Sequence, residues 1–407
     1  MTVVEFFEKS PFENMVSTLL VKPKKLILLG DEKEMSKAVS TYEAFLESKE
    51  TGTKIEPVNI DKNDLKDIED KLTKIIKTEQ NCIFDITGGE DLVLLGCGIV
   101  FAKYHNQYPF KMQRVDIKSG KITDCFSNNK VNISGGLSLS VKELIKLHGG
   151  IVAPEPFVPN LAHKRDVDAI WDIARQSNDT WNDSLAVLCE FEKRTVPKQN
   201  RMNINIDLQT VSAEIRDYNN KFNSYYIFIK KLLKNGLIDD LNVSGNRISY
   251  NYKNATVRRC LHTPGDILEM KTYYEAFSLT DNGKPYFDSC NIGVTIDWDG
   301  VIHNPHDTIK DTKNEIDVML MRAITPVFIS CKNGDVPGIE LYKLNTVAER
   351  FGGKHAKKIL IATNFERESQ NSERAYIQRA KDMDITFITD AAQFNDNDWK
   401  TLFKETV

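Results

Sequence analysis

The chain has 407 residues, of which 41% are hydrophobic, and this length predicts more than one hydrophobic core. Its net charge of -4 excludes a uniformly basic nucleic-acid-binding surface but allows local basic patches. The 7 cysteines are scattered without a CxxC pair, so neither a zinc knuckle nor a disulfide framework is expected. Residues 1–15 carry acids where a secretory signal needs basic residues, and no apolar run could cross a membrane. We therefore expect a cytoplasmic protein with no membrane partner.

Residues 1–148 are predicted to form an α/β domain. Apolar runs at 25–31 and 81–89 are typical of strands, and the segments at 34–50 and 64–79 have apolar residues at helical spacing. Strands that alternate with amphipathic helices indicate a mostly parallel, helix-covered sheet.

Two of these strands end in residues suited to a ligand. Thr87, Gly88 and Gly89 lie between a strand and a helix, and Gly30 and Asp31 follow the other strand. Backbone amides at such turns suit an anion at the carboxyl end of the sheet. The turn is neither a P-loop nor a GxGxxG motif, which argues against ATP and NAD. Tight strand-to-helix geometry alone would also explain the glycines.

The segment 149–260 is predicted to be a connector with a winged-helix-like part. Residues 151–160 contain three prolines and no periodicity, which is typical of a domain boundary. Residues 225–252 then read as a helix, a glycine stop and two short strands. The segment 221–259 contains eight lysines or arginines and only two acids. The basic residues include Lys230, Lys231, Lys234, Arg247, Arg258 and Arg259. This patch could guide a phosphate backbone, or it could be an ordinary solvated helix face.

Residues 261–407 are predicted to form a second α/β domain. A helix at 265–277 precedes three strands, a helix, and two further strands separated by a helix; the strands are expected at 293–300, 314–321, 326–332, 357–363 and 385–389. The five-residue connection at 322–326 favours antiparallel pairing of the strands on either side of it.

Carboxylate, hydroxyl and lysine side chains, which are candidate catalytic groups, lie on these two strands. Alternation places Glu315 and Asp317 on one face of the first strand, and Ser330 and Lys332 on one face of the second. Glu269 on the preceding helix can reach the same point. Carboxylates that hold Mg²⁺ or Mn²⁺, beside a lysine that offsets charge, are what phosphodiester hydrolysis requires. A simple cross-strand ion pair between Asp317 and Lys332 is the alternative.

This arrangement resembles the PD-(D/E)xK restriction-endonuclease-like superfamily, with "GDILE", "EID" and "SCK" as the matching segments. The resemblance implies catalytic roles for Glu269, Asp317, Ser330 and Lys332. It implies a metal site formed by Glu269, Asp317, Glu315 and Cys331. The sequence departs from the family at Ser330, where most members carry a carboxylate, and Glu315 is the candidate substitute.

Residues 1–145 resemble the CARF domain, the CRISPR-associated Rossmann fold, whose strand-to-helix turns bind cyclic oligoadenylates. The segment "SPFENMVSTLLVKPKKLILLGD" is similar to that family's start. The resemblance makes Gly30, Asp31, Thr87, Gly88 and Gly89 the ligand-contacting residues.

The combination resembles one group of type III CRISPR ancillary nucleases. It implies cleavage of DNA and/or RNA, activated by cyclic tetra-adenylate. A symmetric ring ligand is best gripped by two copies of one surface, so a homodimer is expected.

Two other functions remain open. A ligand-responsive regulator would bind DNA through the winged helix and carry an inactive nuclease-like domain, as Ser330 would suggest. A constitutive restriction or repair nuclease would leave the N-terminal domain without a role.

Overall fold

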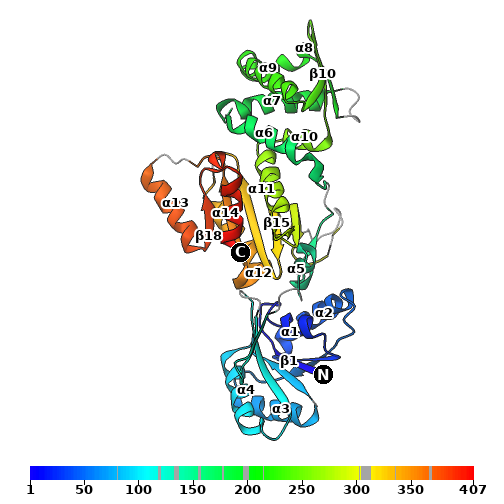
Figure 1. The fold of residues 1–407 in the computed structure, drawn as a ribbon, viewed down its shortest axis with the longest axis vertical. Helices are drawn as coiled ribbons and strands as arrows, with labels where there is room; N and C mark the ends of the chain where they lie inside the picture. Colours follow the sequence, from blue (N-terminus) through cyan, green and yellow to red (C-terminus); the bar gives the residue numbers. More distant parts are fainter. Residues whose placement is uncertain are drawn as a thin grey trace.

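The computed structural model describes residues 1–79, 81–117, 121–132, 137–154, 157–176, 178–195, 201–213, 215–301, 303, 313–334, 336–365 and 369–407. Three units are stacked along the long axis, with the C-terminal unit between the N-terminal unit and a largely helical unit (Figure 1). No helix among the described residues is long and apolar enough to cross a membrane.

The N-terminal unit is built on a seven-stranded sheet of order β3-β2-β1-β4-β5-β6-β7. Strands β1 to β5 are parallel, whereas β6 and β7 add antiparallel strands at one edge. The strands are β1 (Thr2–Phe6), β2 (Lys25–Gly30), β3 (Lys54–Asn59), β4 (Cys82–Asp85), β5 (Phe110–Asp116), β6 (Lys121–Asp124) and β7 (Lys130–Asn132). The order 3-2-1-4-5 is that of a Rossmann-like sheet, which confirms the predicted fold class. In such sheets a ligand crevice forms where the strand order reverses, here between β1 and β4.

Helices cover both faces of this sheet. They are α1 (Val16–Val21), α2 (Glu32–Ser48), α3 (Leu65–Thr78) and α4 (Asp91–Tyr104), followed by α5 (Val141–Leu147) at the end of the unit. Asp31 begins α2 and Asp64 begins α3, because each side chain accepts hydrogen bonds from two backbone N–H groups of the first turn. Both helices lie close to their predicted ranges.

The helical unit contains a winged-helix arrangement. Its elements are α6 (Lys164–Gln176), α7 (Asn178–Arg194), β9 (Asn203–Asp207), α8 (Leu208–Ser212), α9 (Tyr218–Lys234), β10 (Ile238–Ser244), β11 (Arg247–Tyr252) and α10 (Ala255–Cys260). The predicted helix and two-stranded wing are confirmed. The third strand, β9, pairs with β11 and was not predicted.

The C-terminal unit has a six-stranded sheet of order β18-β17-β16-β15-β14-β8. The elements are β8 (Ile151–Val152), α11 (Asp266–Ser278), β14 (Ser289–Asp297), β15 (Lys313–Arg322), β16 (Thr325–Lys332), α12 (Ile339–Gly352), β17 (Lys357–Ala362), α13 (Gln370–Asp382), β18 (Ile385–Ile388) and α14 (Asp396–Thr406). Strand β8 belongs to the segment expected to be a linker, and it pairs with Ile296 and Asp297. The residues after α5 therefore tie the N-terminal half of the chain to the C-terminal sheet.

Strands β15 and β16 form a hairpin with a tighter turn than the sequence suggested. Their last pair is Arg322 with Thr325, which leaves only Ala323 and Ile324 between them, not five residues. The turn closes because Ala323 adopts a positive φ of 53° and donates its N–H to the Asp288 carboxylate at 2.5 Å. The predicted antiparallel pairing is confirmed.

The two faces of β16 belong to different cores. Val327, Ile329 and Cys331 pack into the core that includes α11 and the helical unit. Phe328 faces the other core, which includes α12 and the helix α5. Ser330 and Lys332 continue the α12 side of the strand, and this places them beneath the start of α12.

Candidate functional site

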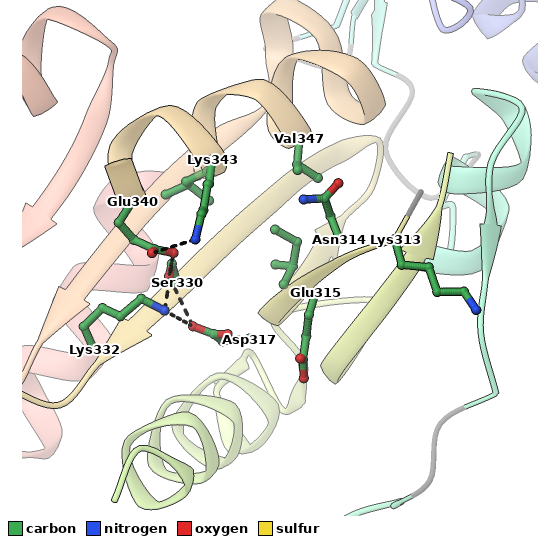
Figure 2. A pocket seen from close by; sticks show the side chains of 11 residues that line it. Lys313, Asn314, Glu315, Asp317, Ser330, Lys332, Glu340, Lys343 and Val347 are labelled. Atoms are coloured by element: carbon green, nitrogen blue, oxygen red, sulfur yellow. Dashed lines mark hydrogen bonds and ion pairs between the residues drawn. The ribbon is translucent and has the colours of Figure 1, made fainter. Parts of the chain in front are cut away.

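A cavity of about 300 Å³ opens where β15 and β16 separate. Pairing of the two strands stops at Val318 and Ile329, so the residues beyond them leave the ladder. Asp317, Ser330 and Lys332 lie at this fork, and Glu340 approaches from the first turn of α12 (Figure 2). The middle of β15, the end of β16 and the start of α12 therefore place four polar side chains together.

Hydrogen bonds and ion pairs join these four side chains. Lys332 Nζ lies 3.6 Å from Asp317 Oδ2 and 3.3 Å from Glu340 Oε1. Ser330 Oγ lies 3.2 Å from each of the same two carboxylate oxygens. The Cys331 N–H donates to Asp317 Oδ2 at 2.5 Å, which fixes this carboxylate at the fork.

Glu340 is the site residue that sequence reasoning missed. From α12 it supplies a second carboxylate next to Ser330, the strand residue at which the sequence departs from the expected carboxylate. Its only local signal is an acid in the first turn of a helix, which is a common feature because it complements the helix dipole.

Burial disfavours the charged form of two carboxyl groups at and beside the site, Asp317 and Glu269. Burial raises the pKa of Asp317, and the Lys332 charge and the hydrogen bonds from Cys331 and Ser330 offset this only in part. Burial and the neighbouring Asp317 raise the pKa of Glu269 to about 8. Burial lowers the pKa of Lys332, but Asp317 and Glu340 outweigh it, so the pKa is raised and the ammonium keeps its charge.

The other residues expected at this site lie around it. Glu315 lines the cavity, but its carboxylate points away from Lys332 in Figure 2. Glu269 lies in the first turn of α11 and is not among the residues that line the cavity. The buried Cys331 side chain contacts Thr272 on α11, with Sγ 3.6 Å from Oγ1, so only its backbone reaches Asp317.

The donor atoms of the site suit a hard divalent cation in their chemistry. Asp317 and Glu340 offer carboxylate oxygens, and Ser330 offers a hydroxyl. Burial, with a smaller contribution from Glu340, raises the pKa of Asp317 and so disfavours its charged form, which a bound cation would stabilise. Within the described ranges, however, no three His, Cys, Asp or Glu side chains are gathered closely enough to hold a metal ion.

The glycine turn after β4 packs against the loop after β1. Thr87 is fixed at both ends: its N–H donates to Asp85 at 2.6 Å, and its Oγ1 accepts from the Val115 N–H at 2.8 Å. Gly89 has a φ of 112°, and a Cβ at Gly88 would lie 3.1 Å from Glu13 Cβ. The glycines are therefore required by close approach and backbone conformation.

Gly30 and Asp31 serve the local structure at the neighbouring strand end. A Cβ at Gly30 would lie 2.5 Å from Phe7 Cβ, and the Asp31 side chain accepts from Lys33 and Glu34 N–H groups. Of the five residues predicted to contact a ligand, Thr87 is the one that lines a cavity between the N-terminal and C-terminal units.

Comparison with known proteins gives a match by structure only. No protein-family model matches the chain, and no curated protein matches it in sequence. Protein VC1899 from Vibrio cholerae matches with a TM-score of 0.71 and 17% identity, over 99% of this chain and 96% of that chain. Can2 from Sulfobacillus thermosulfidooxidans, in complex with cyclic tetra-adenylate, matches with a TM-score of 0.66 and 18% identity, over 99% of this chain and 98% of that chain.

A third structure, of a type III CRISPR defence DNA nuclease activated by cyclic oligoadenylate, matches with a TM-score of 0.49 and 12% identity, over 90% of this chain and 46% of that chain. The fold comparison rests on the first two structures. Across nearly its whole length, this chain has the fold of VC1899 and of Can2.

Proposed function

We propose that the protein is a metal-dependent nuclease of type III CRISPR defence that cleaves DNA and/or RNA when cyclic tetra-adenylate is bound. The observation that carries the proposal is the meeting of Lys332 with the carboxylates of Asp317 and Glu340 at an open cavity. The proposal includes a homodimer acting in the cytoplasm, because a symmetric ring suits two copies of one surface.

The residues of the cavity have separate roles in this reaction. A phosphodiester would enter beside Lys332, whose ammonium offsets the charge that grows on the phosphate oxygens as water attacks phosphorus and the P–O ester bond breaks. Asp317 and Glu340 would hold Mg²⁺ or Mn²⁺, with Ser330 between them and with Glu269 and Glu315 as further carboxylates nearby. The cation would supply Lewis-acid polarisation of the phosphate and a lower pKa for a bound water.

The N-terminal unit supports the ligand part of the proposal. Thr87 lies after β4, next to the crevice expected between β1 and β4. The structure of Can2, which shares the fold, is a complex with cyclic tetra-adenylate. A ligand at this position must favour one arrangement of the chain over another if it is to activate cleavage.

The alternative is a DNA-binding regulator with an inactive nuclease-like domain. Its main argument was the missing carboxylate at Ser330. Glu340 weakens this argument, because its carboxylate stands beside the serine hydroxyl. The basic helix α9 suits either function, since a nuclease also needs to guide its substrate.

One set of incubations separates these functions. Plasmid DNA and a labelled RNA are each incubated with Mn²⁺, with and without cyclic tetra-adenylate. We expect cleavage that depends on the nucleotide and is abolished by Lys332→Ala and by Asp317→Ala in folded protein. Full activity of either variant would overturn the nuclease assignment. Binding of duplex DNA without cleavage would favour the regulator, and equal cleavage without nucleotide would favour a constitutive nuclease.

A further inference from the structure

A second cavity, of about 330 Å³, lies between the N-terminal and C-terminal units. Its polar lining residues are Glu13, Thr87, Arg114, Asp116, Lys354 and His355. The first four belong to the N-terminal unit, at the carboxyl end of its sheet. The last two belong to the short helix η2 (Gly353–His355), which directly follows α12.

Glu13 joins the two sides of this cavity. Its fully buried carboxylate oxygen Oε1 lies 3.1 Å from Lys354 Nζ and 3.1 Å from His355 Nε2, and its other oxygen accepts from Ser10 Oγ. Burial raises the pKa of Glu13, but the bonds from His355, Ser10 and Lys354 outweigh it and hold the pKa at about 2. Glu13 is therefore an anion that two donors of the C-terminal unit already bind.

The same residue touches the glycine turn. A Cβ at Gly88 would lie 3.1 Å from Glu13 Cβ, so the turn and the glutamate are in direct contact. An anionic ligand at the Thr87 turn would lie next to Glu13 and within reach of the same two donors. Arg114 adds a cationic side chain at the edge of the cavity.

We propose that this cavity receives a phosphodiester of the cyclic oligonucleotide, and that the phosphate replaces the Glu13 carboxylate as the partner of Lys354 and His355. The inference rests on the proposed function and adds the C-terminal unit to the ligand site. Two anions compete for one pair of donors, so binding of the phosphate weakens the contact between the loop after β1 and η2.

The size of the cavity limits what enters it. Small-molecule sites commonly span about 300–1,000 Å³, and this cavity is at the lower end of that range. It accommodates one nucleotide unit of a cyclic tetra-adenylate and not the whole ring. The remaining units would extend from the cavity, toward a second copy of the chain in a homodimer.

The helix α12 gives the exchange a route to the nuclease site. Lys354 and His355 follow its C-terminal end, whereas Glu340 lies in its first turn, beside Ser330 and Lys332. A helix of 14 residues is about 21 Å long, so α12 connects the two positions directly. A change at η2 would therefore alter the position of Glu340 at the fork.

The test compares nucleotide affinities of the full-length chain. Calorimetry with cyclic tetra-adenylate is run on the wild type, Lys354→Gln, Glu13→Gln and a control, Lys357→Gln, which removes a lysine that does not line the cavity. We expect Lys354→Gln to weaken binding at least about tenfold, because it removes a charged hydrogen bond to phosphate. We expect Glu13→Gln to strengthen binding, because it removes the competing anion, and Lys357→Gln to match the wild type.

The outcomes separate this inference from the function on which it rests. Absence of nucleotide binding by the wild type would overturn the proposed ligand, and this inference with it. Wild-type binding with unchanged affinities in Lys354→Gln and Glu13→Gln would overturn the phosphate site alone. Weaker binding by both variants would overturn the displacement of Glu13. Lys354 is 64% exposed, so its replacement tests the site even if Glu13→Gln does not fold.

Discussion

Ser330 Oγ and Glu340 Oε1 lie 3.2 Å apart, although one side chain belongs to a strand and the other to the following helix. The pair combines a hydroxyl from β16 and a carboxylate from α12 at one point of the fork. This contact explains how the site keeps two carboxylates beside Lys332 while its strand carries a serine.

The first prediction concerns Glu340. Glu340→Gln removes the negative charge next to Lys332 and one of two carboxylates of the fork, so we expect cleavage to fall at least about 100-fold, with folding retained. The measurement is the initial rate of plasmid cleavage with Mn²⁺ and nucleotide. Glu349→Gln is the matched control, because Glu349 lies on the same helix and accepts from Asn345 at 2.9 Å, away from the cavity. Equal rates for the wild type and Glu340→Gln would exclude Glu340 from the reaction.

An exchange of the two side chains gives a second, sharper prediction. Glu340→Ala should be inactive, and adding Ser330→Glu should return a carboxylate to the same point from the strand. We expect the double variant to regain at least about tenfold over Glu340→Ala, because the two positions are within hydrogen-bond distance. Ser330→Glu alone would place another carboxylate against Glu340. The rate of cleavage should then depend more strongly on the concentration of the divalent cation. No gain in the double variant would mean that the helix position cannot be replaced from the strand.

Local patterns predicted the scaffold of this site but not all of its chemistry. Short-range periodicity placed Ser330 and Lys332 on the same face of a strand, and it predicted the helix at residues 265–277. Glu340 depends on where α12 starts relative to the fork, which is a tertiary relationship. The contact between Glu13 and His355 joins residues 342 positions apart, and no local pattern could reveal it.

One part of the scaffold was also missed. Strand β1, with all five residues buried at the centre of the N-terminal sheet, was not predicted. The run "TVVEF" is short and contains Glu5, whose buried carboxyl has a raised pKa because of burial and the neighbouring Asp85. A charged residue in a short run argues against a buried strand, so the tertiary environment overrides the local signal.

A third prediction concerns pH. The pKa of Glu269 is raised from 4.5 to about 8, so the folded chain binds a proton there more tightly than the unfolded chain. This contribution to stability is present below about pH 4.5 and is lost as the pH rises through about 8. We expect the melting temperature of the cation-free protein to decrease over this window, and Mn²⁺ to raise it more at pH 8 than at pH 6. Glu269→Gln should flatten both dependences, and an unchanged pH profile in this variant would contradict the assignment.

A fourth prediction concerns the basic face of α9. Lys230 and Lys234 are exposed, and Lys230 Nζ lies 4.1 Å from the centre of the Tyr226 ring. If this face contacts phosphates, Lys230→Gln with Lys234→Gln should weaken duplex binding and reduce the salt dependence of log K by about 2. Fluorescence anisotropy over a salt series measures both. The control is Lys66→Gln with Lys74→Gln, which replaces two exposed lysines of α3. If log K depends on salt equally in both double variants, the basic face of α9 is an ordinary solvated surface.

The last prediction tests the ligand turn against the nuclease site. Gly88→Trp places a large side chain where a Cβ alone would already lie 3.1 Å from Glu13 Cβ and 3.2 Å from Glu8 Cβ, so the loop after β1 must move. We expect this variant to lose both nucleotide binding and nucleotide-stimulated cleavage, while cleavage without nucleotide stays at the wild-type level. Gly98→Ala, at an exposed position of α4 with nothing within 4 Å of its Cβ position, controls for the loss of a glycine. Stimulation that survives in Gly88→Trp would place the activator elsewhere on the chain, because no ring could reach Thr87 past that side chain.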